Sequence, residues 1–125
     1  MVDKSFMDRY LADVVAQDPE RLRDWFAPGG VIRWHNSNEE FTVEEYVRAN
    51  CEYPGKWQGR VELAMDTEEG AVSVAKVWSE EGAFRVVSFY RLAAGKIIRL
   101  EEYWGDIGAA PQWRREMGIG RPISL

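Results

Sequence analysis

The sequence predicts an α+β fold in which N-terminal helices cover one face of an antiparallel sheet. Apolar residues recur at spacings of three and four over roughly the first fifty positions, and the period then changes to two. The chain has 125 residues, 46% of them hydrophobic, which is enough for one core. We therefore expect a single domain over residues 1–125, with its core at about residues 5–106 and a C-terminal arm over residues 107–125.

Three helices are expected before the sheet. Residues 5–17 carry one apolar stripe at helical spacing. A second helix is predicted over residues 18–26, "DPERLRDWF", with Asp18 as N-cap and the Pro28-Gly-Gly segment as its end. The capping box "TVEE", which starts at Thr42, predicts a third helix over about residues 43–51.

Four segments with alternating apolar residues follow the third helix and predict strands. Glycine-containing turns join them, which is typical of hairpins, so we expect a meander. A separate short strand is predicted at residues 31–35, and a short helix or irregular arm at residues 111–125. The four segments read "KWQGRVELAMD", "AVSVAKVWSE", "AFRVVSFYRL" and "KIIRLEEYW".

Composition excludes several classes of partner. Acidic residues outnumber Lys and Arg by 21 to 16 and the basic residues are dispersed, so we expect no nucleic-acid binding. No signal-like apolar run is present, and no window approaches the roughly 18 apolar residues of a spanning helix, so we expect no membrane insertion and a cytoplasmic location. The single Cys51 fits a reducing compartment.

The order of elements and two segments resemble the nuclear transport factor 2-like superfamily, in particular its SnoaL-like branch. The segments are "RYLADVVAQDPERLRDWFAPGGVIRW" and "SFYRLAAGKIIRLEEYWGD", and the resemblance covers about residues 5–106. It implies a cone, in which a strongly curved mixed sheet wraps around the helices and leaves a pocket at the wide end, commonly in a homodimer. The superfamily holds isomerases, cyclases, dehydratases and proteins that only bind, so the fold alone does not define a function.

The resemblance to ketosteroid isomerases transfers only some of their site residues. Tyr10 matches a tyrosine of the isomerase oxyanion hole. The position of the proton-moving aspartate corresponds to about Trp34, beside His35, and the second aspartate falls near Ser88. Because both carboxylates are missing here, the resemblance implies the pocket rather than the isomerase mechanism.

Alternation along the last two strands makes Glu102 the main candidate acid or base. Ser88 and Tyr90 share one strand face, Glu102 and Trp104 share another, and both sets are expected inside. A carboxyl in an aromatic cavity loses hydration, which raises its pKa toward the range useful for proton transfer. The alternative is a structural acid paired with an inward Lys76 or with an arginine.

His35, the only histidine, is the second candidate base. If Trp34 faces inward, strict alternation places His35 outward unless the strand bulges. We therefore expect the edge of a site formed more by Trp34 and Asn36 than by His35.

The expected ligand is a small apolar or aromatic molecule. Tyr10 and Ser88 are candidate donors to a developing oxyanion. No cluster of His or Cys predicts a transition-metal site, and no cofactor is implied. The residues expected to bind the ligand are Trp34, Asn36, Trp57, Trp78, Tyr90, Trp104 and Asp106.

Two functions follow from these expectations, and whether the protein is an enzyme stays open. The first is an isomerase, cyclase or dehydratase that acts by proton transfer on an apolar carbonyl or cyclic compound. Glu102 or His35 would then be the acid or base, with Tyr10 and Ser88 as polarising donors. The alternative is a non-catalytic binding or sensing module, or a dimeric interaction protein whose cone is filled by aromatic side chains.

Overall fold

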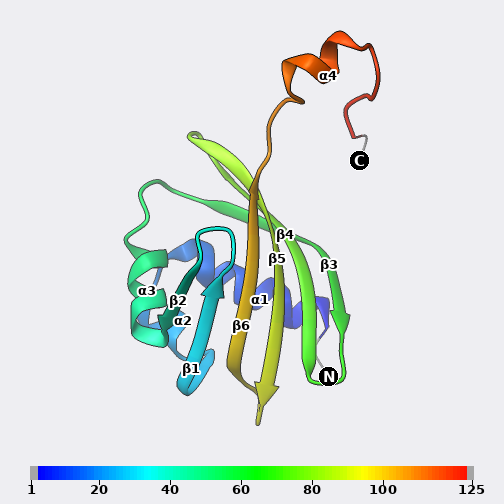
Figure 1. The fold of residues 1–125 in the computed structure, drawn as a ribbon. Coiled ribbons are helices and arrows are strands. Elements are labelled where there is room, and N and C mark those ends of the chain that lie inside the picture. Colours follow the sequence, from blue (N-terminus) through cyan, green and yellow to red (C-terminus); the bar gives the residue numbers. More distant parts are fainter. Residues whose placement is uncertain (1–2, 124–125) are drawn as a thin grey trace.

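The computed structural model describes residues 3–123 and consists of one curved, mixed sheet with its first three helices on the concave side (Figure 1). The six strands lie in the order β2-β1-β6-β5-β4-β3. Their bounds are β1 Phe26–Trp34, β2 Glu39–Thr42, β3 Gln58–Asp66, β4 Gly70–Ser79, β5 Gly82–Ala93 and β6 Lys96–Asp106. The helices are α1 Lys4–Ala16, α2 Pro19–Arg23, α3 Val43–Cys51 and α4 Gln112–Glu116.

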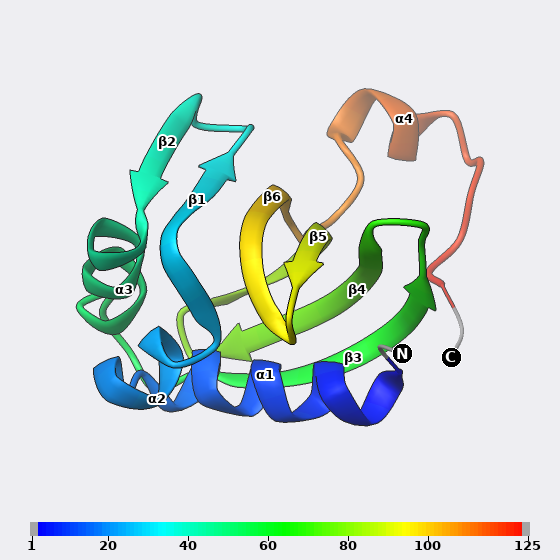
Figure 2. The same cartoon turned by 90° about the horizontal axis from the view of Figure 1, so that it is seen from below.

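Helix α1 runs across the concave face of the sheet (Figure 2). The carboxylate of Asp3 caps it by accepting from the Phe6 amide, and Gln17 ends it in the left-handed conformation. The helix approaches β3 closely at Gly59, where an added Cβ would lie 3.0 Å from the Leu11 side chain. A glycine at this point lets helix and strand pack in direct contact.

The predicted meander and the cone fold are confirmed. Strands β3 to β6 pair in sequence order and antiparallel, and β1 joins the edge of β6 in parallel. The predicted strand faces are confirmed as well: Ser88, Tyr90, Leu100 and Glu102 are buried against α1, whereas Tyr103 is exposed on the convex face.

The prediction for the second helix was wrong at its end. Helix α2 stops at Arg23 and β1 already starts at Phe26, which pairs with Ile97. Between Phe26 and Val31 the register against β6 shifts, because the Pro28-Gly-Gly segment forms a bulge within the strand. The same glycines that were expected to end a helix therefore bend a strand.

The sequence reading also missed β2. Residues 35–38 form a tight turn, with Asn38 at φ 58°, and Glu39–Thr42 then pair antiparallel with β1. Polar residues hid this strand because it lies at the sheet edge and is largely exposed. The capping box at Thr42 and the helix over residues 43–51 are both confirmed.

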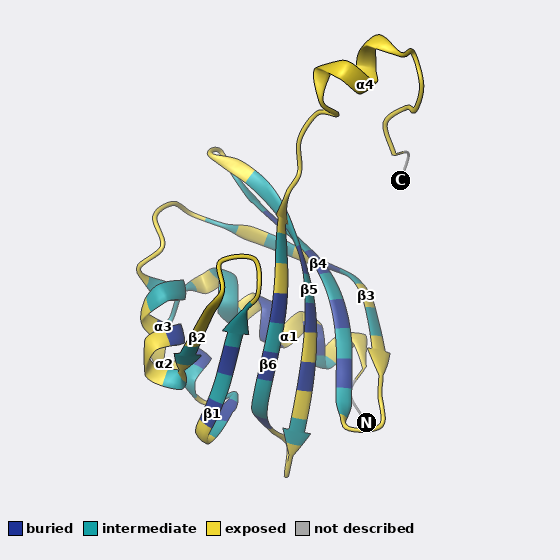
Figure 3. Cartoon of the chain, in the orientation of Figure 1, coloured by how far each residue is buried: buried dark blue, intermediate teal, exposed yellow. Residues whose placement is uncertain are grey.

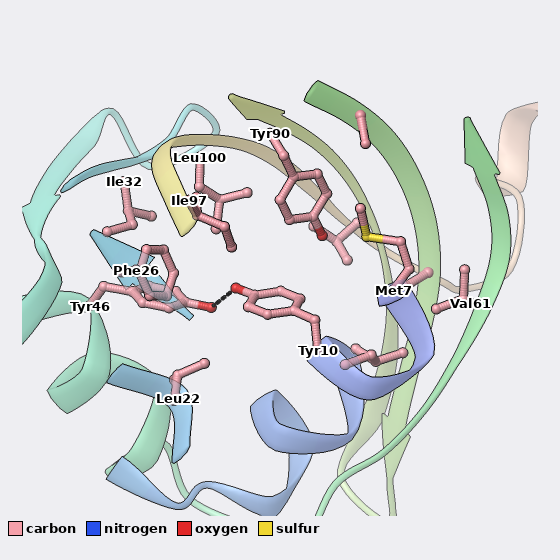
Figure 4. Close-up of a cluster of buried hydrophobic side chains, with 14 of the residues drawn as sticks. Met7, Tyr10, Leu22, Phe26, Ile32, Tyr46, Val61, Tyr90, Ile97 and Leu100 are labelled. Atoms are coloured by element: carbon pink, nitrogen blue, oxygen red, sulfur yellow. Dashed lines mark hydrogen bonds between the residues drawn. The ribbon is translucent and has the colours of Figure 1, made fainter. Parts of the chain in front are cut away.

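The deep part of the cone is filled by side chains (Figure 4). Tyr10 from α1 and Tyr46 from α3 point toward each other and share a hydrogen bond between their hydroxyls, 3.0 Å long. Tyr90 and Ser73 make a second buried pair at 3.0 Å. Aromatic and aliphatic groups therefore occupy the narrow end, and each buried hydroxyl of these pairs has a partner.

The C-terminal arm leads away from the end of β6 and stands clear of the sheet (Figures 1 and 3). Residues 105–123 are all exposed, including Trp113 at 61% and Ile123 at 77%. Helix α4 has no side-chain cap. Within residues 3–123, no helix combines the length and apolar character that crossing a membrane requires.

Candidate functional site

A pocket of about 330 Å³ lies at the wide end of the cone. It opens where the C-terminal ends of α1 and α3 meet the ends of the central strands. Its lining is predominantly apolar and contains no Asp, Glu, Lys, Arg or His. The lining residues are Val14, Val15, Gln17, Trp34, Asn36, Ser37, Ala49, Asn50, Tyr53, Trp57, Val77, Phe84 and Trp104.

Five aromatic side chains form a continuous arc around this pocket. Their ring centroids follow one another at 6.4 Å from Trp34 to Trp104, 6.2 Å from Trp104 to Phe84, and 5.6 Å from Phe84 to Trp57. Tyr53 closes the arc at 5.6 Å from Trp57. Successive planes are turned by 38° to 83°, so the arc curves around the space instead of stacking flat. We call these five residues the aromatic arc.

Glu102 lies behind the aromatic arc and is only 4% exposed. Trp34 Nε1 donates to Glu102 Oε1 at 3.1 Å, and Ser88 Oγ donates to Oε2 at 2.6 Å. Burial raises the pKa of the Glu102 carboxyl, although the hydrogen bonds from Ser88 and Trp34 and the nearby Trp104 N–H oppose the rise. The acid therefore favours its neutral form more than an exposed glutamate does.

Trp104 also directs its indole N–H toward Glu102, but the geometry falls short of a hydrogen bond. Trp104 Nε1 is consequently buried without a partner. Such an unpaired donor is costly in a protein interior, where most buried polar atoms are satisfied.

Glu102 has no cationic partner among residues 3–123 at ion-pair distance. The suggested pairing with Lys76 is wrong because alternation in β4 buries Ala75 and Val77 and turns Lys76 to the convex face. There its Nζ lies 5.5 Å from the Trp78 ring centroid. Glu102 is thus a buried acid held only by neutral donors.

The polar residues of the lining hold the pocket walls together. Asn36 Oδ1 accepts from the Trp104 backbone amide at 3.1 Å. Gln17 Nε2 donates to the carbonyls of Asn50 and Tyr53, at 2.9 and 2.8 Å. Asn50 Nδ2 in turn donates to the Val14 carbonyl at 2.9 Å. These bonds join α1 to α3 and the β1 turn to β6, so the pocket shape is set before a ligand enters.

Four of the eleven predicted site residues line the pocket, namely Trp34, Asn36, Trp57 and Trp104. Tyr10, Ser88 and Tyr90 are buried in the filled part of the cone and do not line the pocket, and Ser88 lies opposite Glu102 in the strand register. Burial raises the pKa of both tyrosines, and the nearby Glu102 contributes to each rise. Both phenols are therefore neutral donors near pH 7.

His35, Trp78 and Asp106 lie away from the pocket. His35 Nε2 lies 3.0 Å from Glu101 Oε1, and its ring stacks on Tyr103 with centroids 4.3 Å apart. These contacts place the imidazole on the convex face, as strict alternation requires. Trp78 lies on the same convex side beside Lys76, and Asp106 is exposed at the end of β6.

Sequence reasoning missed Phe84 and Tyr53 as parts of the arc. Alternation with the buried Val86 would have placed Phe84 inward, but its position at the strand start hid its closeness to Trp57. Tyr53 belongs to an irregular turn after α3, for which no period exists. No group of three His, Cys, Asp or Glu suited to a metal ion occurs among the described residues.

The sequence matches no protein-family model and no curated protein. Solved structures are similar in fold. A presumptive ketosteroid isomerase of Kribbella flavida superposes with a TM-score of 0.78 at 20% identity, covering 97% of this chain and 90% of its own. An NTF2-like protein of unknown function from Burkholderia xenovorans gives 0.74 at 17% identity, with 94% and 92% covered.

A third similar structure carries a ligand. It is a protein of ketosteroid isomerase-like fold from Catenulispora acidiphila in complex with trimethylamine, with a TM-score of 0.66 at 13% identity over 78% of this chain and 82% of its own. Together these matches show that the chain has the cone fold of the nuclear transport factor 2-like superfamily. At these sequence identities the matches define the architecture only, so any function has to be inferred from the residues of the pocket.

Replacing Glu102 should change how stability depends on pH. The folded-state pKa of Glu102 is raised above its ordinary value of 4.5, so its contribution to stability is present below that pH and is lost as pH rises to the folded pKa. Glu102→Gln cannot ionise. The melting temperature of Glu102→Gln minus that of the parent protein should therefore become more positive between pH 4 and pH 8.

Glu101→Gln provides the matched control for this measurement. Burial tends to raise the pKa of Glu101, but the hydrogen bond from His35 and the charges of Arg99 and Arg33 outweigh it, so the pKa is lowered. Its melting-temperature difference should drift in the negative direction as pH rises. A pH-independent difference for Glu102→Gln would contradict the raised pKa.

Proposed function

We propose that the protein binds a small, largely apolar organic molecule in the pocket at the wide end of the cone. The observation that carries this proposal is the aromatic arc, which surrounds about 330 Å³ with uncharged walls. Ligand sites of small-molecule proteins typically span about 300–1,000 Å³ and combine apolar walls with a few polar groups. The preformed bonds of Asn36, Gln17 and Asn50 support a ready-shaped site, which lowers the entropic cost of binding.

Proteins of the same fold support the proposal. The Catenulispora acidiphila protein is in complex with trimethylamine, a small organic molecule. The Kribbella flavida protein is a presumptive isomerase of a carbonyl compound class, the ketosteroids. Neither identity is high enough to transfer a substrate, so the ligand class for this chain has to come from its own residues.

Proton transfer at Glu102 is the second candidate function. A buried carboxyl with a raised pKa and no counter-cation suits a general acid or base. An isomerisation would use it to remove a proton next to a carbonyl and to return that proton at a second carbon. Glu102 does not itself line the pocket, so its carboxyl would reach a ligand only if Trp34 or Trp104 turned aside. The lining is therefore better suited to binding than to catalysis.

Within this second function, Ser88 holds the Glu102 carboxyl, and Tyr10 and Tyr90 keep the surrounding polar network neutral. We assign no proton transfer to His35, because its imidazole bonds to Glu101 on the opposite face of the sheet. Asp106 and Trp78 would take no part in either function.

We also propose a homodimer through the convex sheet face. Apolar residues cross four strands there in register: Leu63 lies beside Val74, Val74 beside Val87, and Val87 beside Tyr103. Leu63 is 47% and Tyr103 44% exposed, and Phe89 in the neighbouring row is 46% exposed. An apolar face of this extent is typical of a contact surface.

Ligand binding should be visible in tryptophan fluorescence. Three of the six tryptophans line the pocket, so a bound molecule should shift or quench the emission. In Trp57→Leu the ligand-induced change in emission should be smaller and the affinity for the ligand should fall about tenfold, since one aromatic side chain of the pocket lining is lost. Trp113→Leu, in the exposed arm, serves as control and should bind as the parent does. Saturation by a ligand confirmed by mass spectrometry without any spectral change would exclude this pocket.

If the protein is catalytic through Glu102, Glu102→Gln should lower turnover by about 10²- to 10⁴-fold with little effect on ligand affinity, as is usual for loss of an acid or base. Glu101→Gln is the adjacent control and should retain full turnover. Equal turnover of Glu102→Gln and the parent protein, both folded by circular dichroism, would assign the reaction to another group or leave binding as the function.

Sedimentation should report a dimer at micromolar concentration. Phe89→Glu introduces a charge into the convex apolar face and should shift the protein to monomer, because an unpaired charge is costly to bury. Met117→Glu replaces an apolar residue of the arm that is 59% exposed, against 46% for Phe89, and should leave the dimer intact. A parent protein that sediments as a monomer would refute the proposed interface.

A further inference from the structure

The pocket offers a ligand much aromatic surface and no charge of its own. All five members of the aromatic arc line it, and their neighbours Val14, Val15 and Val77 are aliphatic. Aromatic rings carry negative charge on their faces, and several rings around one point attract a cation held within about 6 Å of their centroids. An arc of three indoles, one phenol and one phenyl ring is therefore suited to a positively charged group with an apolar surface.

Glu102 is the acidic group directly behind the arc, and no cation among residues 3–123 pairs with it. Its carboxyl contacts two donors, Trp34 Nε1 and Ser88 Oγ, and both are uncharged. The other titratable groups that face it are Tyr10 from α1, Tyr46 from α3 and Tyr90 from β5. Burial raises the pKa of all three phenols, so none of them supplies charge of either sign.

The indole N–H groups connect Glu102 to the pocket. Trp34 donates to the carboxyl, and this bond draws the indole into the field of the acid and polarises its ring. The Trp104 N–H points the same way but remains unpaired. A cation beside the rings would supply the counter-charge that the ionised Glu102 carboxylate lacks.

We propose that the ligand is an organic ammonium compound with an alkylated nitrogen, tertiary or quaternary. This inference rests on the proposed binding function and specifies its ligand class. Glu102 acts here as a positioning residue, since it orients Trp34 and, in its ionised form, adds a negative field behind the arc without touching the ligand.

Two other ligand charges fit the pocket poorly. An anion would meet no Lys, Arg or His in the lining and would approach the buried Glu102. A primary ammonium needs several acceptors for its N–H groups. The carbonyl oxygens of Asn50, Tyr53 and Val14 already accept from side chains, and so does Asn36 Oδ1 from the Trp104 amide. An alkylated ammonium donates few or no hydrogen bonds and is stabilised by ring faces instead.

Matched probes separate charge from shape. Choline carries a trimethylammonium group and a hydroxyl, and 3,3-dimethyl-1-butanol is its neutral isostere with carbon in place of nitrogen. Both would be titrated into the full-length protein by calorimetry, together with benzyltrimethylammonium as a larger cation. We expect at least one ammonium to bind, and choline to bind about tenfold or more tightly than its isostere, as several cation–ring contacts imply.

Variants then assign the preference to the residues that carry it. Trp57→Leu should lower affinity for choline more than affinity for the alcohol. Trp113→Leu is the control and should change neither. Glu102→Gln should reduce the ratio of the two affinities, whereas Glu101→Gln on the opposite face should leave the ratio unchanged. Circular dichroism confirms that each variant is folded before it is titrated.

The outcomes of these titrations test the ammonium ligand class separately from the proposed binding function of the pocket. If the neutral alcohol binds as tightly as choline, the ammonium class is wrong and the pocket function stands. The ammonium class is also wrong if neither ammonium binds at concentrations up to about 10 mM while neutral apolar compounds still change the tryptophan emission. The pocket function stands in that case as well. If no compound of either kind binds, the pocket function itself fails. A choline preference that survives in Glu102→Gln would overturn the role of Glu102.

Discussion

A carboxyl group without a counter-charge organises the centre of this molecule. Glu102 on β6 receives hydrogen bonds from Trp34 on β1 and Ser88 on β5, so one side chain ties three adjacent strands at the point where the filled cone meets its pocket. Removing a charged group from water is costly, and neutral donors recover only part of that cost. The raised pKa of Glu102, the orientation of Trp34 and the unpaired N–H of Trp104 all follow from this one placement.

The interior of the cone is divided by depth. At the narrow end the hydroxyls of Tyr10 and Tyr46 form one buried pair and those of Tyr90 and Ser73 another, among side chains that fill the space. At the wide end the walls are rings and amides, with their amide groups engaged in holding α1, α3 and the β1 turn together. The narrow end is therefore filled, and the pocket lies at the wide end, which is where we propose that the ligand binds.

Neighbouring residues have opposite environments because strands alternate. Glu101 lies on the convex face, where His35, Arg33 and Arg99 lower its pKa, whereas Glu102 is buried beside indoles that cannot neutralise it. Trp34 and His35 divide in the same way, one toward the pocket and one stacked on Tyr103. The convex face thus carries the charges and the exposed aromatic residues, and the pocket lies on the concave face.

Local pattern was sufficient for most of the fold. The helical stripe around Tyr10, the capping box at Thr42 and the alternation that buries Glu102 and exposes His35 depend on near neighbours, so the sequence by itself determined the elements, the strand faces and the division between Glu101 and Glu102. Local pattern did not predict the bulge at Pro28 or the edge strand β2. Pairing of β1 with β6, and of β2 with β1, outweighs the local signals of a turn there. Only the tertiary structure decided which aromatic residues meet. Phe84, Trp34 and Trp104 from three strands join Tyr53 and Trp57 from the connection between α3 and β3, while Trp78, Tyr90 and Asp106 lie elsewhere. Spacing along the chain does not encode the distances between these four segments.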